Sequence, residues 1–146
     1  MELDPNNAIV KLCAKGMDIE GSQPEAASRL FLQAWEEAGN EVEKFIAAHY
    51  VARHQKTAVE KLKWDVRALA LALSIPGDAA KTALPSLYLN IAKCHEELND
   101  RDLARRNYES GLSFIDFLPD DGYGNMIRGG LRNGLERVST GAEGLR

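Results

Sequence analysis

The sequence has few cysteines and no surplus of basic residues, and each shortage argues against a class of protein. Cys13 and Cys94 are the two cysteines in 146 residues, and no CxxC or similar metal-ligand spacing occurs. Both lie in apolar periodic segments, which predicts reduced, buried thiols rather than a disulfide. The formal net charge of -4 at pH 7 lacks the basic surplus that drives nucleic-acid binding, so no nucleic-acid partner is expected.

Long apolar runs and targeting signals are also missing. No uninterrupted apolar run approaches the roughly 18 residues of a membrane-spanning helix. The first residues lack the basic and apolar regions of a signal peptide. We therefore expect a cytoplasmic protein with no membrane partner.

The signatures of common enzymes do not occur. There is no GxGxxG or P-loop to hold phosphate, and no GxSxG nucleophile elbow. His49 and His54 are five residues apart and would project from different sides of a helix, unlike the i, i+4 pair of a zinc site. We expect histidines satisfied by neighbouring groups, no metal, no cofactor and no catalysis.

Apolar residues instead recur every three or four positions in seven segments, which predicts an all-α fold. No sustained alternation of period two suggests a strand. Proline, glycine, asparagine and aspartate separate the segments, with Asp4 and Pro5 predicted to begin the first helix. The segments cover about residues 5–21, 24–38, 41–55, 59–74, 84–98, 100–118 and 126–138.

Several helix faces and ends can be predicted more closely. In the first helix Val10, Cys13, Ala14 and Met17 are expected to face inward. In the fourth helix the inward stripe is expected to comprise Val59, Leu62, Val66, Leu69 and Leu73, widened by Trp64, Ala68 and Leu71. Pro85 leaves two possibilities open, since the fifth helix either begins near it or is kinked by it.

The acidic, glycine-rich segment 120–125 suggests either a calcium loop or a turn that ends in Asn125 as a helix cap. Counting Asp120 as the first loop position puts Leu131 where calcium loops carry glutamate, which favours the turn. Gly130 and Gly134 of the last helix either permit close packing or weaken it. One domain over residues 1–138 and a disordered tail over residues 139–146 are predicted.

The sequence also contains an internal repeat. Residues 87–112 place large and small side chains in a pattern that resembles a tetratricopeptide repeat, carried by Tyr88, Ile91, Ala92, Ala104, Tyr108 and Gly111. Ala27, Phe31 and Ala34 restate its second half, with Ala14 and Met17 in first-helix positions. The resemblance implies a right-handed α-solenoid of about three helix-turn-helix pairs, ended by a C-terminal capping helix.

The resemblance also implies a binding surface, because the first helix of each pair lines the concave face in this family. The residues that would lie there are Lys11, Lys15, His49, Tyr50, Arg53, Asn90, Lys93 and Glu97. Some family members hold a C-terminal carboxylate with lysine, asparagine and arginine on this face, although Lys15 departs from that pattern. The function implied is a non-enzymatic scaffold that binds a protein or peptide.

Two alternatives remain open. A small-ligand sensor or minor enzyme would use the groove between the second and third pairs, around Tyr50, Arg53 and Asn90. Self-association through an exposed apolar patch near the ends of the stack would make a homo-oligomer.

Overall fold

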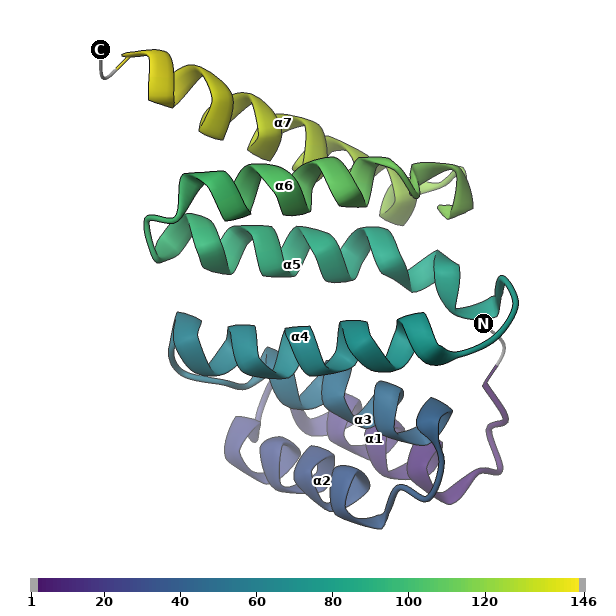
Figure 1. Ribbon diagram of the computed structural model, residues 1–146. Helices are drawn as coiled ribbons and strands as arrows, with labels where there is room; N and C mark the ends of the chain where they lie inside the picture. Colours follow the sequence, from purple (N-terminus) through teal and green to yellow (C-terminus); the bar gives the residue numbers. More distant parts are fainter. Residues whose placement is uncertain (1–2, 145–146) are drawn as a thin grey trace. The chain divides into compact units, whose positions relative to one another are not determined.

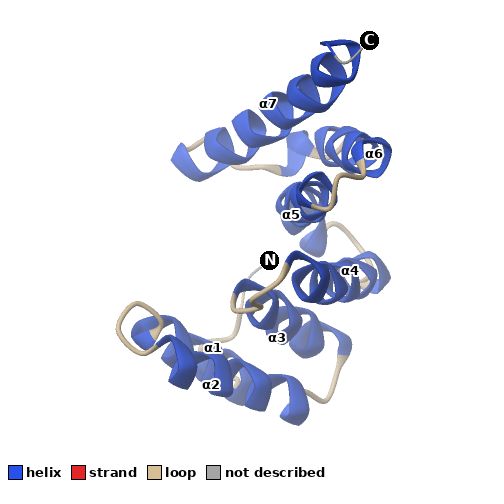
Figure 2. Cartoon of the chain, turned by 90° about the vertical axis from the view of Figure 1, so that its left-hand side faces the viewer, coloured by secondary structure: helices blue, strands red, loops and turns tan. Residues whose placement is uncertain are grey.

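The computed structural model describes the backbone of residues 3–144 and the side chains of residues 3–139. Regular structure in this range is helical throughout, and no β-strand occurs between residues 3 and 144 (Figures 1 and 2). The predicted all-α class is confirmed. Residues 1–79 and 80–146 form two compact units, which we call the N-terminal unit and the C-terminal unit. The single domain predicted over residues 1–138 stays a prediction.

Residues 3–79 of the N-terminal unit form four helices connected by short turns, which Figure 1 shows. They are α1 (Ala8–Ile19), α2 (Pro24–Glu37), α3 (Glu41–Arg53) and α4 (Ala58–Ser74). Each helix packs against the next, and α1 also packs against α3. The third helix is buried on several sides, as its nearly uniform apolar sequence predicts, through Phe45, Ile46, Ala47, Ala48, Val51 and Ala52.

Short polar side chains fix where these helices begin. Asn40 Oδ1 accepts a hydrogen bond from Glu43 N at 2.9 Å, and Thr57 Oγ1 accepts one from Glu60 N at 3.1 Å. Both satisfy backbone donors that a helix leaves unpaired. The predicted start at Asp4 is wrong, because Asn7 Oδ1 caps α1 by accepting from the second and third amides after it.

A close approach of α1 and α2 depends on Gly16. A Cβ atom at this position would lie 2.4 Å from the Phe31 ring, so no larger residue fits without movement. Gly16 is therefore the small residue of this helix pair. The prediction that placed Ala14 and Met17 inward is wrong, since both are exposed and the buried face of α1 comprises Ile9, Cys13 and Gly16.

The fourth helix buries only part of the predicted face: Ala68 is buried as predicted, and Leu62, Trp64, Leu69 and Leu71 are half-buried. Val59, Val66 and Leu73 are 54%, 48% and 54% exposed, while the buried residues are Asp65, Ala68 and Ala72. The two alanines suit close packing on α3, whereas the larger apolar residues leave more distance between helices. Burial raises the pKa of Asp65 from its ordinary value of 3.8 to about 6, although the charge of Lys61 opposes the rise.

Both tryptophans lie in the N-terminal unit and contact each other. The rings of Trp35 in α2 and Trp64 in α4 meet edge to face, with centroids 5.2 Å apart. The Arg67 guanidinium lies 4.6 Å from the Trp64 centroid and 5.5 Å from that of Trp35. This cation–π contact joins α2 and α4, although α2 packs mainly on α1 and α4 on α3.

The C-terminal unit contains three helices that pack on one another (Figure 1). They are α5 (Leu84–Glu97), α6 (Arg101–Leu112) and α7 (Gly122–Gly144), with short 3-10 helices η1 (Ala79–Ala83) and η2 (Ile115–Phe117) before α5 and after α6. Pro85 is the second residue of α5, so the helix begins there. The core includes Leu89, Ala92, Ala104, Tyr108, Leu118, Ile127, Leu131 and Val138.

The last helix is longer than predicted and packs closely on α6. A Cβ atom at Gly134 would lie 2.2 Å from the Tyr108 ring, so this glycine permits the contact. The prediction that Asn125 caps α7 is wrong, since the helix begins at Gly122 and Asp121 Oδ1 accepts from Gly124 N at 2.8 Å. Backbone helix continues through Gly144, within the predicted disordered tail, and residues 145–146 lie outside the described residues.

Candidate functional site

The three predicted site residues of α3 lie at its C-terminal end, where α1 also ends. Glu20 joins the two helices, because its carboxylate accepts from Arg53 Nη2 at 2.6 Å and lies 2.9 Å from His54 Nε2. Sequence reasoning missed Glu20, which has no distinctive spacing from Arg53. The Arg53 guanidinium is therefore already paired within the unit.

Tyr50 and His49 are half-buried beside this ion pair. The Tyr50 ring stacks on Phe31 with centroids 5.2 Å apart, and the Arg53 guanidinium lies 5.5 Å from the Tyr50 centroid. Burial raises the pKa of Tyr50, whereas burial and the nearby Arg53 charge lower the pKa of His49. These side chains are held by packing, and His49 is kept mainly neutral at pH 7.

The other predicted residues divide between the two units. Lys11 and Lys15 are exposed on α1 in the N-terminal unit, and Asn90, Lys93 and Glu97 belong to α5 in the C-terminal unit. Within the C-terminal unit Lys93 and Glu97 do lie together. They line a hollow of about 320 Å³ with Glu96 and Arg137.

A hydrogen-bonded network forms one wall of this hollow. Arg137 donates through Nε and Nη2 to the two oxygens of Glu96, each at 3.0 Å, and Tyr108 Oη donates to Glu96 at 2.5 Å. The hydrogen bonds from Arg137 lower the pKa of Glu96, so the carboxylate stays ionised. The network ties α7 to α5 through the exposed Arg137, whereas Lys93, which is also exposed at this hollow, takes no part in it.

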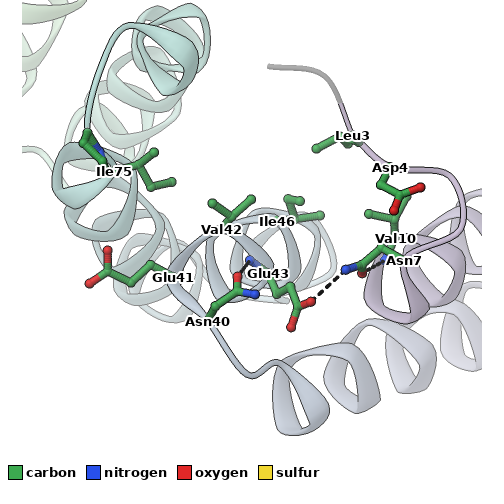
Figure 3. A pocket seen from close by; sticks show the side chains of 11 residues that line it. Leu3, Asp4, Asn7, Val10, Asn40, Glu41, Val42, Glu43, Ile46 and Ile75 are labelled. Carbon is green, nitrogen blue, oxygen red and sulfur yellow. Dashed lines mark hydrogen bonds between the residues drawn. The ribbon is translucent and has the colours of Figure 1, made fainter.

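A larger groove, which none of the predicted residues lines, opens at the N-terminal ends of α1 and α3 (Figure 3). Its volume is about 560 Å³. Val42 and Ile46 of α3 form its floor, and Leu3 and Ile75 face one another across it (Figure 3). The full lining is Leu3, Asp4, Asn7, Val10, Asn40, Glu41, Val42, Glu43, Ile46, Ile75 and Pro76.

Polar side chains beside the groove fix its walls to one another. Asn7 Nδ2 donates to Glu43 Oε2 at 2.8 Å, which ties the start of α1 to α3. Ser74 Oγ lies 3.1 Å from Glu41 Oε2 and 2.7 Å from Leu71 O, so its single proton is shared between α3 and the last turn of α4. Three segments distant in sequence are thereby held around one apolar floor.

The charge of the lining is negative. It contains the carboxylates of Asp4, Glu41 and Glu43 and, among the residues that the structure describes there, no basic side chain. The Asn7 hydrogen bond, followed by one from the backbone of Gly39, lowers the pKa of Glu43, so this carboxylate stays ionised near neutral pH. The groove can hold apolar side chains, with acceptors for cationic donors at its edge.

No family model, curated protein or solved structure matches this chain. The tetratricopeptide resemblance therefore stays a prediction. Between residues 3 and 144, no helix combines the length and apolar composition needed to cross a membrane.

Proposed function

We propose that this chain is a non-enzymatic cytoplasmic scaffold that binds a partner protein or peptide. In this proposal its helix pairs are tetratricopeptide-like units of a right-handed solenoid, and α7 is the capping helix. Packing within each unit supports it, since α1 contacts both α2 and α3, and α5 contacts both α6 and α7. Such contacts are expected where first helices pack side by side in a repeat.

The observation that carries the binding proposal is the groove between the first helices of the two N-terminal pairs. Its floor is apolar and open, and Leu3 and Val42 remain 42% and 37% exposed. Partially exposed apolar side chains in a fixed concavity favour ligand or partner binding. By contrast, Tyr50 and Arg53 already contact Phe31 and Glu20, which makes a small-ligand site around them the less favoured alternative.

Affinity capture with the full chain, followed by titration calorimetry with each purified candidate, tests the proposal. We expect at least one protein to bind directly with a stoichiometric heat signal. A parallel thermal-shift screen separates the alternatives, because a ligand that binds the folded state raises the melting temperature. Stabilisation by metabolites, with no directly binding protein, would replace the scaffold with a small-ligand sensor.

A further inference from the structure

The groove at the start of α1 and α3 combines two properties that specify a ligand. Leu3, Val42 and Ile75 offer apolar surface, and Asp4 and Glu41 add exposed carboxylates at its edge. An apolar ligand alone would leave those carboxylates without a cationic partner, whereas an acidic ligand would be repelled by them. The groove therefore selects for a ligand that is both apolar and basic.

We propose that the groove binds a segment of a partner protein in which one or two large apolar side chains are flanked by lysine or arginine. This inference rests on the proposed scaffold function and specifies its partner. It reverses the charge expected from the sequence, which placed a lysine- and arginine-lined surface on the concave face for a carboxylate ligand.

The size of the groove fits a short segment. A volume of about 560 Å³ lies within the roughly 300–1,000 Å³ of typical ligand sites, enough for one or two large side chains. On the floor Ile46 is 6% exposed and Val42 is 37% exposed, and Leu3 on the wall is 42% exposed, so the groove is deepest at Ile46 and accessible from Val42 outward. Apolar groups of the partner occupy the base, and its charged groups remain near water.

The carboxylates have structural roles that leave them able to bind a cation. Asp4 Oδ1 accepts from Asn6 N at 2.9 Å, and Glu41 Oε2 accepts from Ser74 Oγ at 3.1 Å. An ionised carboxylate accepts about four hydrogen bonds, so each retains acceptor capacity. Two helix N-termini at the groove contribute roughly half a positive charge each, which three carboxylates outweigh.

Selection of random 12-residue peptides on phage against the full chain tests the inference. We expect the enriched peptides to share one or two large apolar residues beside lysine or arginine. Synthesised with a fluorophore, they should bind less tightly in 300 mM than in 50 mM salt, because salt screens the exposed carboxylates.

Variants then locate the site. Val42→Lys places a long cation on the floor and should weaken binding at least tenfold. Asp4→Asn with Glu41→Gln removes two charges while keeping hydrogen-bond acceptors, and should weaken binding about tenfold and reduce its salt dependence. The matched control is Asp18→Asn with Glu25→Gln, which changes the net charge by the same amount. Asp18 is exposed near the C-terminal end of α1 and Glu25 near the N-terminal end of α2, whereas the groove lies at the N-terminal end of α1. This control should bind as the unaltered chain does.

The outcomes separate this inference from the scaffold function. Enriched peptides that are acidic, or that bind the Val42→Lys variant normally, would overturn the inference and leave the scaffold function standing. A dimer that light scattering shows to dissociate in Val42→Lys would put a second copy in the groove and also overturn it. Failure to enrich any peptide, together with no directly binding protein in calorimetry, would contradict both the inference and the scaffold function.

Discussion

At the scale of single residues, Asp65 connects burial with pH. Its side chain is 1% exposed on the face of α4 that packs inward, and burial raises its pKa to about 6. A carboxyl group whose pKa is higher in the folded than in the unfolded state favours folding only while protonated. The ionised form therefore opposes folding at neutral pH.

This pKa predicts the direction of a pH effect. Below about pH 4 Asp65 is protonated in both states, and between about pH 4 and 6 the unfolded state loses the proton first. The free energy of unfolding should thus fall as pH rises through this window, by up to about 3 kcal/mol from this group. Asp65→Asn should abolish the contribution of this group to the pH dependence. Urea unfolding of the unaltered chain and the variant at pH 4.5 and 7.5 would measure the difference.

The comparison with Asp65→Asn is needed because His49 acts in the opposite sense. Its lowered pKa means that the unfolded state binds the proton more readily, so stability rises with pH near the ordinary histidine pKa of 6.5. The lowered pKa values of Glu43 and Glu96 also make stability rise with pH, and their contribution is lost as pH falls below about 4.5, the ordinary glutamate value. Identical pH profiles for the unaltered chain and the Asn variant would contradict the assignment to Asp65.

At the scale of helices, the contact of α6 and α7 has a sharp steric test. Gly134→Ala would place a methyl group 2.2 Å from the Tyr108 ring, which is fully buried. Because a packed aromatic ring cannot move freely, we expect a loss of about 1–3 kcal/mol in the free energy of unfolding.

The same helix supplies the control. A Cβ atom at Gly129 would meet nothing within 4 Å, so Gly129→Ala gains helix propensity and should stabilise by about 0.5–1 kcal/mol. Chemical unfolding monitored by circular dichroism measures both. Equal effects of the two substitutions would mean that α7 does not pack on Tyr108.

The orientation of α4 can be tested in a similar way. Ala68 is fully buried, so Ala68→Leu should overpack the interior and cost about 1–3 kcal/mol. Val66 is 48% exposed, so Val66→Ala should change stability by less than about 0.5 kcal/mol. Thermal unfolding compares them, and a larger loss of stability from Val66→Ala than from Ala68→Leu would mean that Val66 is buried, as the sequence predicted.

The extents of α2 and α4 were easier to predict than the face that α4 buries, whereas α6 ends at Leu112, before the predicted residue 118, and α7 extends beyond both predicted ends. Proline and glycine constrain the backbone locally, and for this reason the segment starting at Pro24 and the break after Ser74 were predicted closely. The buried face of α4 depends on what α3 presents to it. Ala68 packs inward as predicted, but Asp65 and Ala72 are buried beside it while Val59 and Val66 are exposed, a rotation of the helix that periodicity alone does not reveal.

The candidate groove was beyond sequence reasoning for a related reason. Leu3, Val42 and Ile75 are ordinary apolar residues in three separate segments, and nothing in their local spacing indicates that they meet. The concave-face residues predicted from the resemblance were chosen mainly because their side chains are charged or polar. In the structure one of them, Arg53, forms an ion pair with Glu20 within the N-terminal unit.

At the scale of the whole molecule, the predicted single domain can be tested optically. Trp35 and Trp64 both lie in the N-terminal unit, so tryptophan fluorescence reports on that unit, while far-ultraviolet circular dichroism reports on all the helices. One cooperative domain requires that the two unfolding curves coincide. Gly134→Ala in the C-terminal unit should then also lower the fluorescence midpoint. Separate midpoints would show that the units unfold independently.

The two buried cysteines offer a way to follow the unfolding of each unit. Cys13 and Cys94 are each 2% exposed, one in each compact unit, and burial raises the pKa of Cys13 to about 11. Since the thiolate is the reactive form, alkylating reagents should modify each sulfur slowly until its surroundings open. Mass spectrometry of pulse-alkylated chains would therefore time the opening of either half separately, without any engineered label.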